Sequence, residues 1–402
     1  MMPKVRTGLD VWVSDEFRAL RGKRVGAIVN PTSVDSRFRH LADLLSEAKG
    51  QGVTLAALFG PEHGVRGEAQ YMVAVDDEPR DPKTGVPVHS LYGSTFKSLS
   101  PRAEWLEGLD ALVFDIQDVG SRYYTYVYTM ALCMRAAAKA KIPLYVLDRP
   151  NPLGGVQVEG NAVGVKYRSF VGLYSLPNRH GMTAGELARL FNARDAAEGV
   201  GGCELVVVPC EGLERGMRWE DTELPFIPPS PNMPTADTAL VYPGMCLGEG
   251  TNVSEGRGTT RPFEQFGAPW VRSDALIKQL ESYALPGVAF RACGFTPTFD
   301  KYKGQSCNGA FIHVTDKNEF LPLRTGVAIF HALRQLWPAE FAWRADAYEF
   351  VEDVPAFDLL CGTDQVRRGI EEGWPLDRLF EGFEADREAF LRERAAYLLY
   401  GQ

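Results

Sequence analysis

Three charged or titratable side chains lie close together in residues 59–67. Glu62, His63 and Arg66 bring a carboxylate, an imidazole and a guanidinium together within five residues. Three glycines and one proline surround them, so the backbone can turn sharply and leave space beside the side chains. A carboxyl group in such a loop can give or take a proton, and its neighbours can orient it or bind an anion. The alternative is a tight turn in which Glu62 and Arg66 only pair with each other in solvent.

Similar polar clusters follow the other apolar runs of the first half of the chain. Residues 53–58 carry no charge and have the length of a buried strand, so the loop with Glu62 begins where that strand ends. The other clusters are Asn30, Thr32 and Ser33; Asp115, Gln117, Asp118 and Arg122; and Asp148, Arg149 and Asn151. Ligands of open parallel sheets bind beyond the carboxyl ends of the strands, so the clusters together predict a functional edge. Singly, each cluster is also compatible with ordinary loop chemistry.

A second polar stretch occupies residues 247–261 and is rich in glycine. It contains Glu249, Asn252, Ser254 and Arg257, and it cannot bury an apolar face or form a stable helix. We predict a binding loop here, with a flexible surface turn as the alternative.

Strands alternate with helices in the part of the chain that positions these clusters. Apolar runs predict strands at residues 24–30, 53–59, 111–116, 142–147 and 205–209, and a hairpin at 86–92. Helical spacing or capping signals predict helices at residues 36–49, 122–141 and 184–192. This alternation predicts an α/β fold with a parallel sheet covered on both faces.

The pattern changes at the proline-rich residues 225–234, which we interpret as a linker or domain edge. Beyond it we expect strands at 288–293 and 309–314 and helices at 323–336 and 377–400. The expected domains are therefore residues 1–228 and a smaller α+β domain of residues 229–402.

Composition and missing motifs narrow the class of function. The chain has 402 residues and a formal net charge of −9, which disfavours nucleic acid as a partner. Seven cysteines without Cys-x-x-Cys spacing indicate neither a zinc site nor a disulfide framework. We find no secretion signal and no 18-residue apolar run, so no membrane span is expected. Motifs of dinucleotide binding, P-loop kinases, zincins and serine hydrolases are absent from the sequence, so carboxylate chemistry such as glycoside hydrolysis becomes attractive.

Five motifs in order resemble the exo-beta-N-acetylmuramidases of the NamZ type, a family of peptidoglycan hexosaminidases. They begin at Gly60, Phe114, Asp148, His180 and Glu249 and read GPEHGVRG, FDIQDVGSRYYTY, DRPNP, HGMTxGE and EGTNVSEGRGT. The resemblance extends from about residue 7 to residue 402.

The resemblance implies a Rossmann-like, doubly wound parallel sheet that binds no dinucleotide, with a second, smaller α+β domain closing a cleft. It also implies release of N-acetylmuramic acid from the non-reducing end of peptidoglycan glycans, without a cofactor. The family's catalytic glutamate corresponds to Glu62. Such a substrate implies the cell envelope or periplasm, although we find no export signal in this chain, and the cytoplasm is the alternative. Protein partners are not predicted.

We therefore expect Glu62 to be the general acid, oriented by His63 or Arg66. Asp115, Asp118 or Glu249 would meet the positive charge that develops at the anomeric carbon, or the substrate's own acetamido oxygen would do so. N-acetylmuramic acid carries a lactyl carboxylate, which an arginine would bind. The candidate substrate-binding residues are Arg66, Gln117, Asp118, Arg122, Tyr123, Arg149, Asn151, Glu249, Asn252, Ser254 and Arg257, with Tyr124 and Tyr126 as further stacking platforms.

Two other functions fit the sequence less well. A metal-dependent hydrolase could use His63 and Asp115 as ligands, but six histidines with no pair at ligand spacing argue against it, and we predict no metal. A two-lobed protein that binds an amino sugar without cleaving it is the other alternative.

Overall fold

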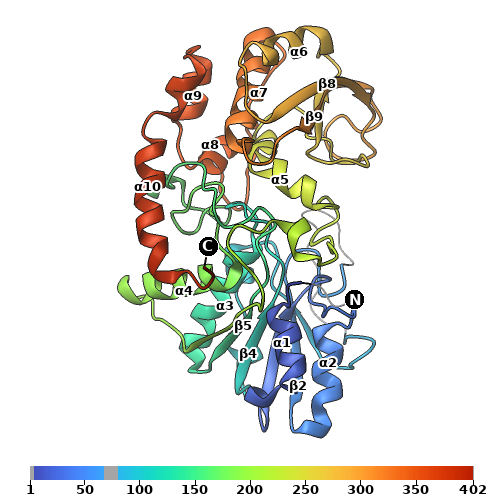
Figure 1. The fold of residues 1–402 in the computed structure, drawn as a ribbon, viewed down its shortest axis with the longest axis vertical. Helices are drawn as coiled ribbons and strands as arrows, with labels where there is room; N and C mark the ends of the chain where they lie inside the picture. Colours follow the sequence, from blue (N-terminus) through green and yellow to red (C-terminus); the bar gives the residue numbers. More distant parts are fainter. Residues whose placement is uncertain (1–3, 68–79, 402) are drawn as a thin grey trace.

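A computed structural model describes residues 4–67 and 80–401 of the protein. Within these residues, six parallel strands form a sheet in the order β3-β2-β1-β4-β5-β6, and a smaller domain contains a second, antiparallel sheet (Figure 1). The first sheet consists of β1 (Arg24–Val29), β2 (Thr54–Gly60), β3 (Val88–Ser90), β4 (Ala111–Asp115), β5 (Leu144–Leu147) and β6 (Leu205–Val208). This order reverses between β1 and β4, as in doubly wound folds. The predicted α/β fold class is confirmed.

Alternate residues of the strands face opposite layers of helices. Ala111 and Val113 of β4 pack with α1 (Gly8–Ser14) and α2 (Leu41–Glu47). Leu112 and Phe114 pack on the opposite side with α3 (Tyr126–Ala140) and α4 (Ala184–Ala197). Because successive side chains of a strand point to opposite faces, a continuous apolar run is what a sheet covered on both sides requires.

The second domain is built on a three-stranded antiparallel sheet in the order β7-β9-β8. Its strands are β7 (Gln265–Ala268), β8 (Val288–Phe295) and β9 (Cys307–Val314), and its main helices are α6 (Ser273–Glu281) and α7 (Pro322–Leu336). Between the two sheets lies α5 (Ala236–Met245), which packs closely against α7.

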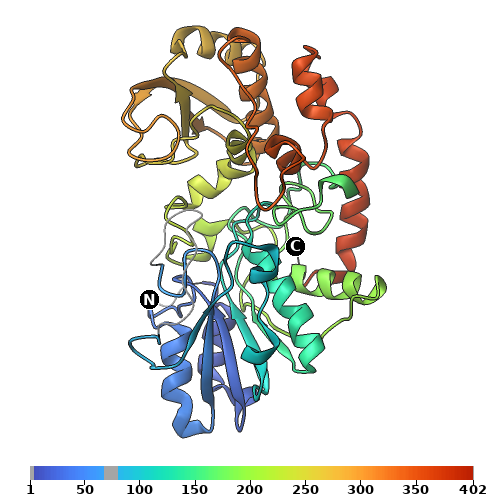
Figure 2. The same ribbon diagram turned by 180° about the vertical axis from the view of Figure 1, so that it is seen from behind.

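The C-terminal part of the chain returns to the first domain. After α8 (Ala356–Cys361) and α9 (Gln365–Glu371), α10 (Phe383–Arg394) runs alongside the molecule towards α4 in both views (Figures 1 and 2). The Tyr400 hydroxyl donates to Asp148 Oδ2 at 2.5 Å and accepts from the Cys210 backbone N–H at 2.9 Å. The chain end is therefore anchored beside β5 and β6.

Several predicted elements differ from those observed. Residues 86–92 do not form a hairpin, since β3 instead pairs in parallel with β2 and forms the edge of the sheet. The predicted helix at 36–49 begins only at Leu41, where His40 accepts a hydrogen bond from the Ala42 backbone N–H. The helix predicted at 377–400 is reduced to α10 with short 3-10 turns on either side. The sequence analysis missed α1, α5, α6, α8, α9 and β7.

In the part of the chain that the structure describes, no helix combines the length and the apolar character needed to cross a membrane.

Candidate active site

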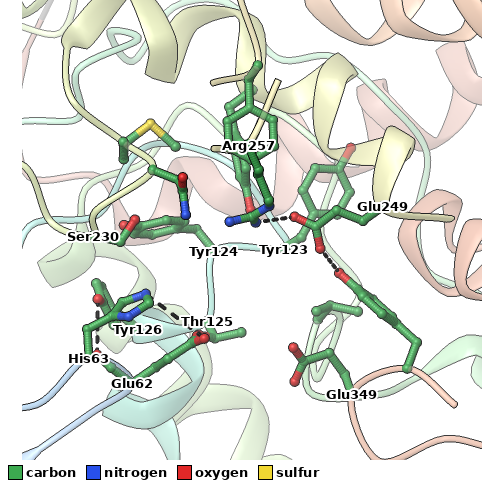
Figure 3. A pocket seen from close by; sticks show the side chains of 16 residues that line it. Glu62, His63, Tyr123, Tyr124, Thr125, Tyr126, Ser230, Glu249, Arg257 and Glu349 are labelled. Carbon is green, nitrogen blue, oxygen red and sulfur yellow. Dashed lines mark hydrogen bonds and ion pairs between the residues drawn. The ribbon is translucent and has the colours of Figure 1, made fainter. Parts of the chain in front are cut away.

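A pocket with about 520 Å³ of empty space lies where the two domains meet (Figure 3). The first domain contributes residues that follow the carboxyl ends of β2 and β4, together with Val171, which follows β5. The rest come from the proline-rich segment and the second domain. Its lining consists of Glu62, His63, Tyr123, Tyr124, Thr125, Tyr126, Val171, Ser230, Asn232, Met233, Tyr242, Glu249, Arg257, Phe263, Tyr348 and Glu349.

The loop after β2 presents Glu62 and His63 to this pocket. The Glu62 side chain is 13% exposed, and its Oε1 lies 4.0 Å from Nε2 of His63. His63 and Gly64 both have left-handed backbone conformations, with φ of 74° and 80°. Such a φ is uncommon for a residue other than glycine, and strain of this kind is frequent at functional sites. The turn brings the two side chains into the pocket together (Figure 3).

Glu249 and Arg257 form an ion pair on the opposite side of the pocket. Arg257 donates to Glu249 Oε1 at 2.5 Å, and the Tyr348 hydroxyl donates to Glu249 Oε2 at 2.7 Å. Burial raises the pKa of Glu249, but Arg257 and the Tyr348 hydroxyl outweigh it, so the pKa is lowered overall. Glu249 is thus an ionised carboxylate with both oxygens bound by protein groups.

Glu349 is a further carboxyl group of the pocket. The residue is 7% exposed, and it has a left-handed φ of 46°. Burial, together with the nearby carboxylates of Glu62 and Glu249, raises the pKa of Glu349 to about 8. The pocket therefore contains glutamates in different electrostatic environments.

Aromatic rings in edge-to-face contact form one wall. Tyr124 lies 5.0 Å from Tyr126 and 5.8 Å from Tyr242 between ring centroids, and Tyr242 lies 4.8 Å from Phe263. The Arg257 guanidinium stands 5.0 Å above the Phe263 ring. Such a wall offers apolar faces for a sugar ring and holds the arginine in place.

Asp115 and Arg149 lie outside this lining and bind each other. Arg149 donates to both carboxylate oxygens of Asp115, at 2.6 and 2.9 Å, and both residues are buried. Burial raises the pKa of Asp115 despite the attraction of Arg149. The structure therefore gives these two predicted site residues a role in joining the ends of β4 and β5.

The remaining predicted residues after β4 and β5 also bind protein groups, and all four are buried. Gln117 donates to the carbonyls of Asp118 and Pro150, and Asp118 accepts from the Gly120 N–H and lies 3.3 Å from His180 Nε2. Arg122 donates to the carbonyls of Asn161, Leu176 and Leu360. Asn151 donates to the Met182 carbonyl and accepts from the Leu153 N–H. None of the four lines the pocket.

Three other predicted residues lie away from the pocket lining. Arg66 forms ion pairs with Asp43 and Asp81, at 3.0 and 2.9 Å. Asn252 donates to the Glu340 carbonyl, and Ser254 accepts from the Gly256 N–H. Of the predicted residues, the pocket unites Glu62, His63, Tyr123, Glu249 and Arg257, together with the expected stacking residues Tyr124 and Tyr126.

Sequence reasoning missed Glu349 and Tyr348, which lie in a charged stretch without periodicity. It also interpreted residues 225–234 only as a linker or domain edge, although Ser230, Asn232 and Met233 of that segment line the pocket. The density of prolines, which stiffens a loop, was the one local signal that this segment has a defined shape.

Among residues 4–67 and 80–401, no three His, Cys, Asp or Glu side chains gather closely enough to hold a metal ion. The proposed ligands His63 and Asp115 of the metal-dependent alternative are also separated, since only His63 lines the pocket.

Comparison with known proteins places the chain among relatives of similar length. Residues 25–237 match the family model of the N-terminal part of exo-beta-N-acetylmuramidase NamZ, and residues 240–400 match that of its C-terminal part. The chain is 46% identical over 398 residues to the peptidoglycan beta-N-acetylmuramidase NamZ of Bacillus subtilis, covering 99% of this chain and 92% of that protein.

Two crystal structures of DUF1343 family proteins from Bacteroides fragilis have the same fold. They are 36% and 32% identical, with TM-scores of 0.86 and 0.75, and each comparison covers 99% of both chains. With family models matching both domains and a relative of this identity over nearly its whole length, the chain belongs to the exo-beta-N-acetylmuramidase NamZ family.

Proposed function

We propose that this protein is a glycoside hydrolase that releases N-acetylmuramic acid from the non-reducing end of peptidoglycan-derived glycans. The observation that carries this proposal is the pocket between the domains, to which Glu62 contributes a carboxyl group and Arg257 a cation. Membership of the family, whose relative in Bacillus subtilis is named for this activity, supports the choice of substrate.

In this proposal Glu62 is the general acid. Its side chain is largely shielded from solvent but still reaches the pocket, which is the position required to protonate the oxygen between two sugars. His63, 4.0 Å away, would orient the carboxyl group, and the aromatic wall would stack on the sugar.

Arg257 would bind the lactyl carboxylate that distinguishes N-acetylmuramic acid from N-acetylglucosamine. It is the arginine of the described lining, whereas Arg66, Arg122 and Arg149 lie outside it. A guanidinium presents several donors in a fixed plane and suits a carboxylate better than an ammonium group does.

The proposal is tested with a disaccharide that has N-acetylmuramic acid at its non-reducing end. We expect the wild-type protein to release the two monosaccharides and Glu62→Gln to turn over about 100-fold more slowly or worse, because the amide has no proton to give. Products are followed by mass spectrometry. Glu47→Gln, at an exposed position of α2, is the matched control and should retain wild-type turnover. A wild-type protein that binds the disaccharide but never cleaves it would instead indicate a sugar-binding protein.

Arg257→Lys tests the recognition of the lactyl group. The variant keeps the charge opposite Glu249 but loses the planar donors, so the inhibition constant of free N-acetylmuramic acid should rise about 10-fold or more. The inhibition constant of N-acetylglucosamine should change much less. Arg261→Lys, on the exposed part of the same loop, is the control. Equal weakening of both sugars would refute this role of Arg257.

A further inference from the structure

Glu349 is a pocket residue with a carboxyl oxygen that no group of the described residues binds. Its Oε2 is buried and has no hydrogen-bond partner among the described residues, although the side chain belongs to the pocket lining. In the close-up view its carboxyl group points into the space beside Glu62 (Figure 3). A buried polar atom without a partner is costly, so it is a rare feature that needs an explanation.

Of the other acidic candidates, Glu249 and Asp115 have both oxygens bound within the protein, and Asp118, whose Oδ1 also lacks a partner in the described part of the chain, lies outside the pocket lining. Glu249 uses one oxygen for Arg257 and the other for the Tyr348 hydroxyl. Asp115 is bound at both oxygens by Arg149 and lies outside the lining. Glu349, unlike Glu249, therefore keeps a carboxyl oxygen available for a molecule in the pocket.

The backbone around Glu349 is fixed in an unfavourable conformation. Glu349 and Phe350 have φ of 46° and 69°, and the turn is closed by mutual backbone hydrogen bonds between Tyr348 and Val351. Before the turn, the Arg344 N–H donates to the Gly250 carbonyl, and within it Tyr348 reaches Glu249. These contacts tie the turn to the segment of Glu249 and Gly250, so the strain serves to aim the Glu349 side chain.

We propose that Glu349 is the second carboxyl group of the reaction, which meets the positive charge that develops on the sugar while Glu62 protonates the leaving oxygen. This inference rests on the proposed glycosidase function. The proton of Glu62 passes to the bridging oxygen, the bond from that oxygen to the anomeric carbon breaks, and its electron pair stays on the departing sugar. The carboxylate of Glu349 faces the cationic sugar. Water then adds its hydroxyl to the anomeric carbon and returns a proton to Glu62.

The electrostatics of the pocket agree with this division of roles. Burial and the neighbouring glutamates raise the pKa of Glu349 to about 8, so this group of carboxyl side chains retains a proton at neutral pH. When carboxyl groups interact, a titration step belongs to the interacting groups together, and the proposed reaction uses the state in which Glu349 is ionised. A carboxyl pair that shares one proton supplies both an acid and an anion.

The leaving group separates the two roles. The nitrophenolate of a nitrophenyl N-acetylmuramide leaves without being protonated. The kcat of Glu62→Gln should therefore fall less than about 10-fold on this substrate, against about 100-fold or more on the disaccharide. Glu349→Gln should lose about 100-fold or more on both substrates, because the charge on the sugar develops with either leaving group. The measurement is kcat for both substrates, with Glu352→Gln, exposed on the same segment, as the control.

The fold of each variant is checked by its thermal unfolding midpoint and by binding of free N-acetylmuramic acid. If Glu349→Gln does not fold, Glu349→Asp replaces it in the test. This variant keeps the charge but withdraws it by one methylene group, and its kcat is measured on the same two substrates. Its expected loss is about 10-fold or more on both substrates. A folded variant at Glu349 with turnover within about threefold of wild type on both substrates overturns the inference, as does a loss confined to the disaccharide. Neither result contradicts the proposed glycosidase activity, which is refuted if the wild-type protein leaves the disaccharide uncleaved.

Discussion

Glu349 is buried beside other carboxyl groups, and this changes how the folded protein binds protons. Burial is the largest cause of its raised pKa; Glu62 and Glu249 raise the pKa further, and Arg344 lowers it. Burial and the same three glutamates raise the pKa of the Tyr92 hydroxyl. The carboxyl group has an ordinary pKa of 4.5 and a pKa of about 8 in the folded protein. Between these values the folded protein holds a proton that the unfolded chain releases. The contribution of Glu349 to the free energy of unfolding is therefore fully present below pH 4.5, and it is lost as the pH rises towards 8.

Glu349→Gln removes this titration, so the variant and the wild type should respond differently to pH. Their unfolding midpoints should be similar near pH 5, and the variant should be more stable by about 2 °C or more near pH 8.5. The measurement is thermal unfolding across this pH range, with Glu352→Gln as the exposed control. A difference that does not change with pH would contradict the raised pKa of Glu349.

At the scale of elements, the close contact between α5 and α7 sets the position of one side of the pocket. A Cβ atom on Gly244 would lie 1.9 Å from the Pro322 carbonyl oxygen, and one on Gly326 would lie 2.3 Å from the Gly244 carbonyl oxygen. Only glycine at both positions allows this approach. The 3-10 helix Cys246–Gly250, which carries Glu249, follows α5 directly, so the contact also positions that carboxylate.

Gly244→Ala should therefore force α5 and α7 apart. We expect the unfolding midpoint to fall by about 4 °C or more, since overpacking of this kind costs about 1–3 kcal/mol or more. Turnover should fall with it, because Glu249 and the lining move. Gly294→Ala in β8 is the control, since its Cβ would meet no non-neighbouring atom closer than 3.6 Å. Equal midpoints for the two variants would show that the contact between α5 and α7 is not tight.

At the scale of the whole molecule, the pocket depends on both domains. Glu62 and His63 belong to the first domain, whereas Glu249, Arg257 and Glu349 come from the second half of the chain. The C-terminal segment then packs back on the first domain through hydrogen bonds of Tyr400 to Asp148 and Cys210. These returning contacts restrain the two domains relative to each other and so help to preserve the geometry of a pocket that neither domain forms alone. The expected division at residues 228 and 229 stays a prediction.

Much of the first domain follows from local sequence. The runs that became β1, β2, β4, β5 and β6 are apolar and short, and burial of both faces of a strand leaves that signal directly in the sequence. The loop with Glu62 was predictable for the same reason, because it begins where such a run ends. The edge strand β3 was mistaken for part of a hairpin, since a strand of three residues carries almost no pattern of its own.

The partners of charged side chains did not follow from local sequence. Asp115 and Glu249 were both candidates for the same role, yet Asp115 is bound by Arg149 outside the pocket and Glu249 lines it. Glu349 gave no local signal, because its importance comes from its proximity to Glu62, a residue far away in the chain.

The sequence by itself determined five of the six strands of the first sheet, the turn that exposes Glu62 and the kinship with a family, because these depend on neighbouring residues and on the order of motifs. Only the tertiary structure decided which carboxyl groups share the pocket and which are neutralised elsewhere. The physical reason is that ion pairing, burial and proton sharing depend on distances in space, which are set when the two domains pack against each other.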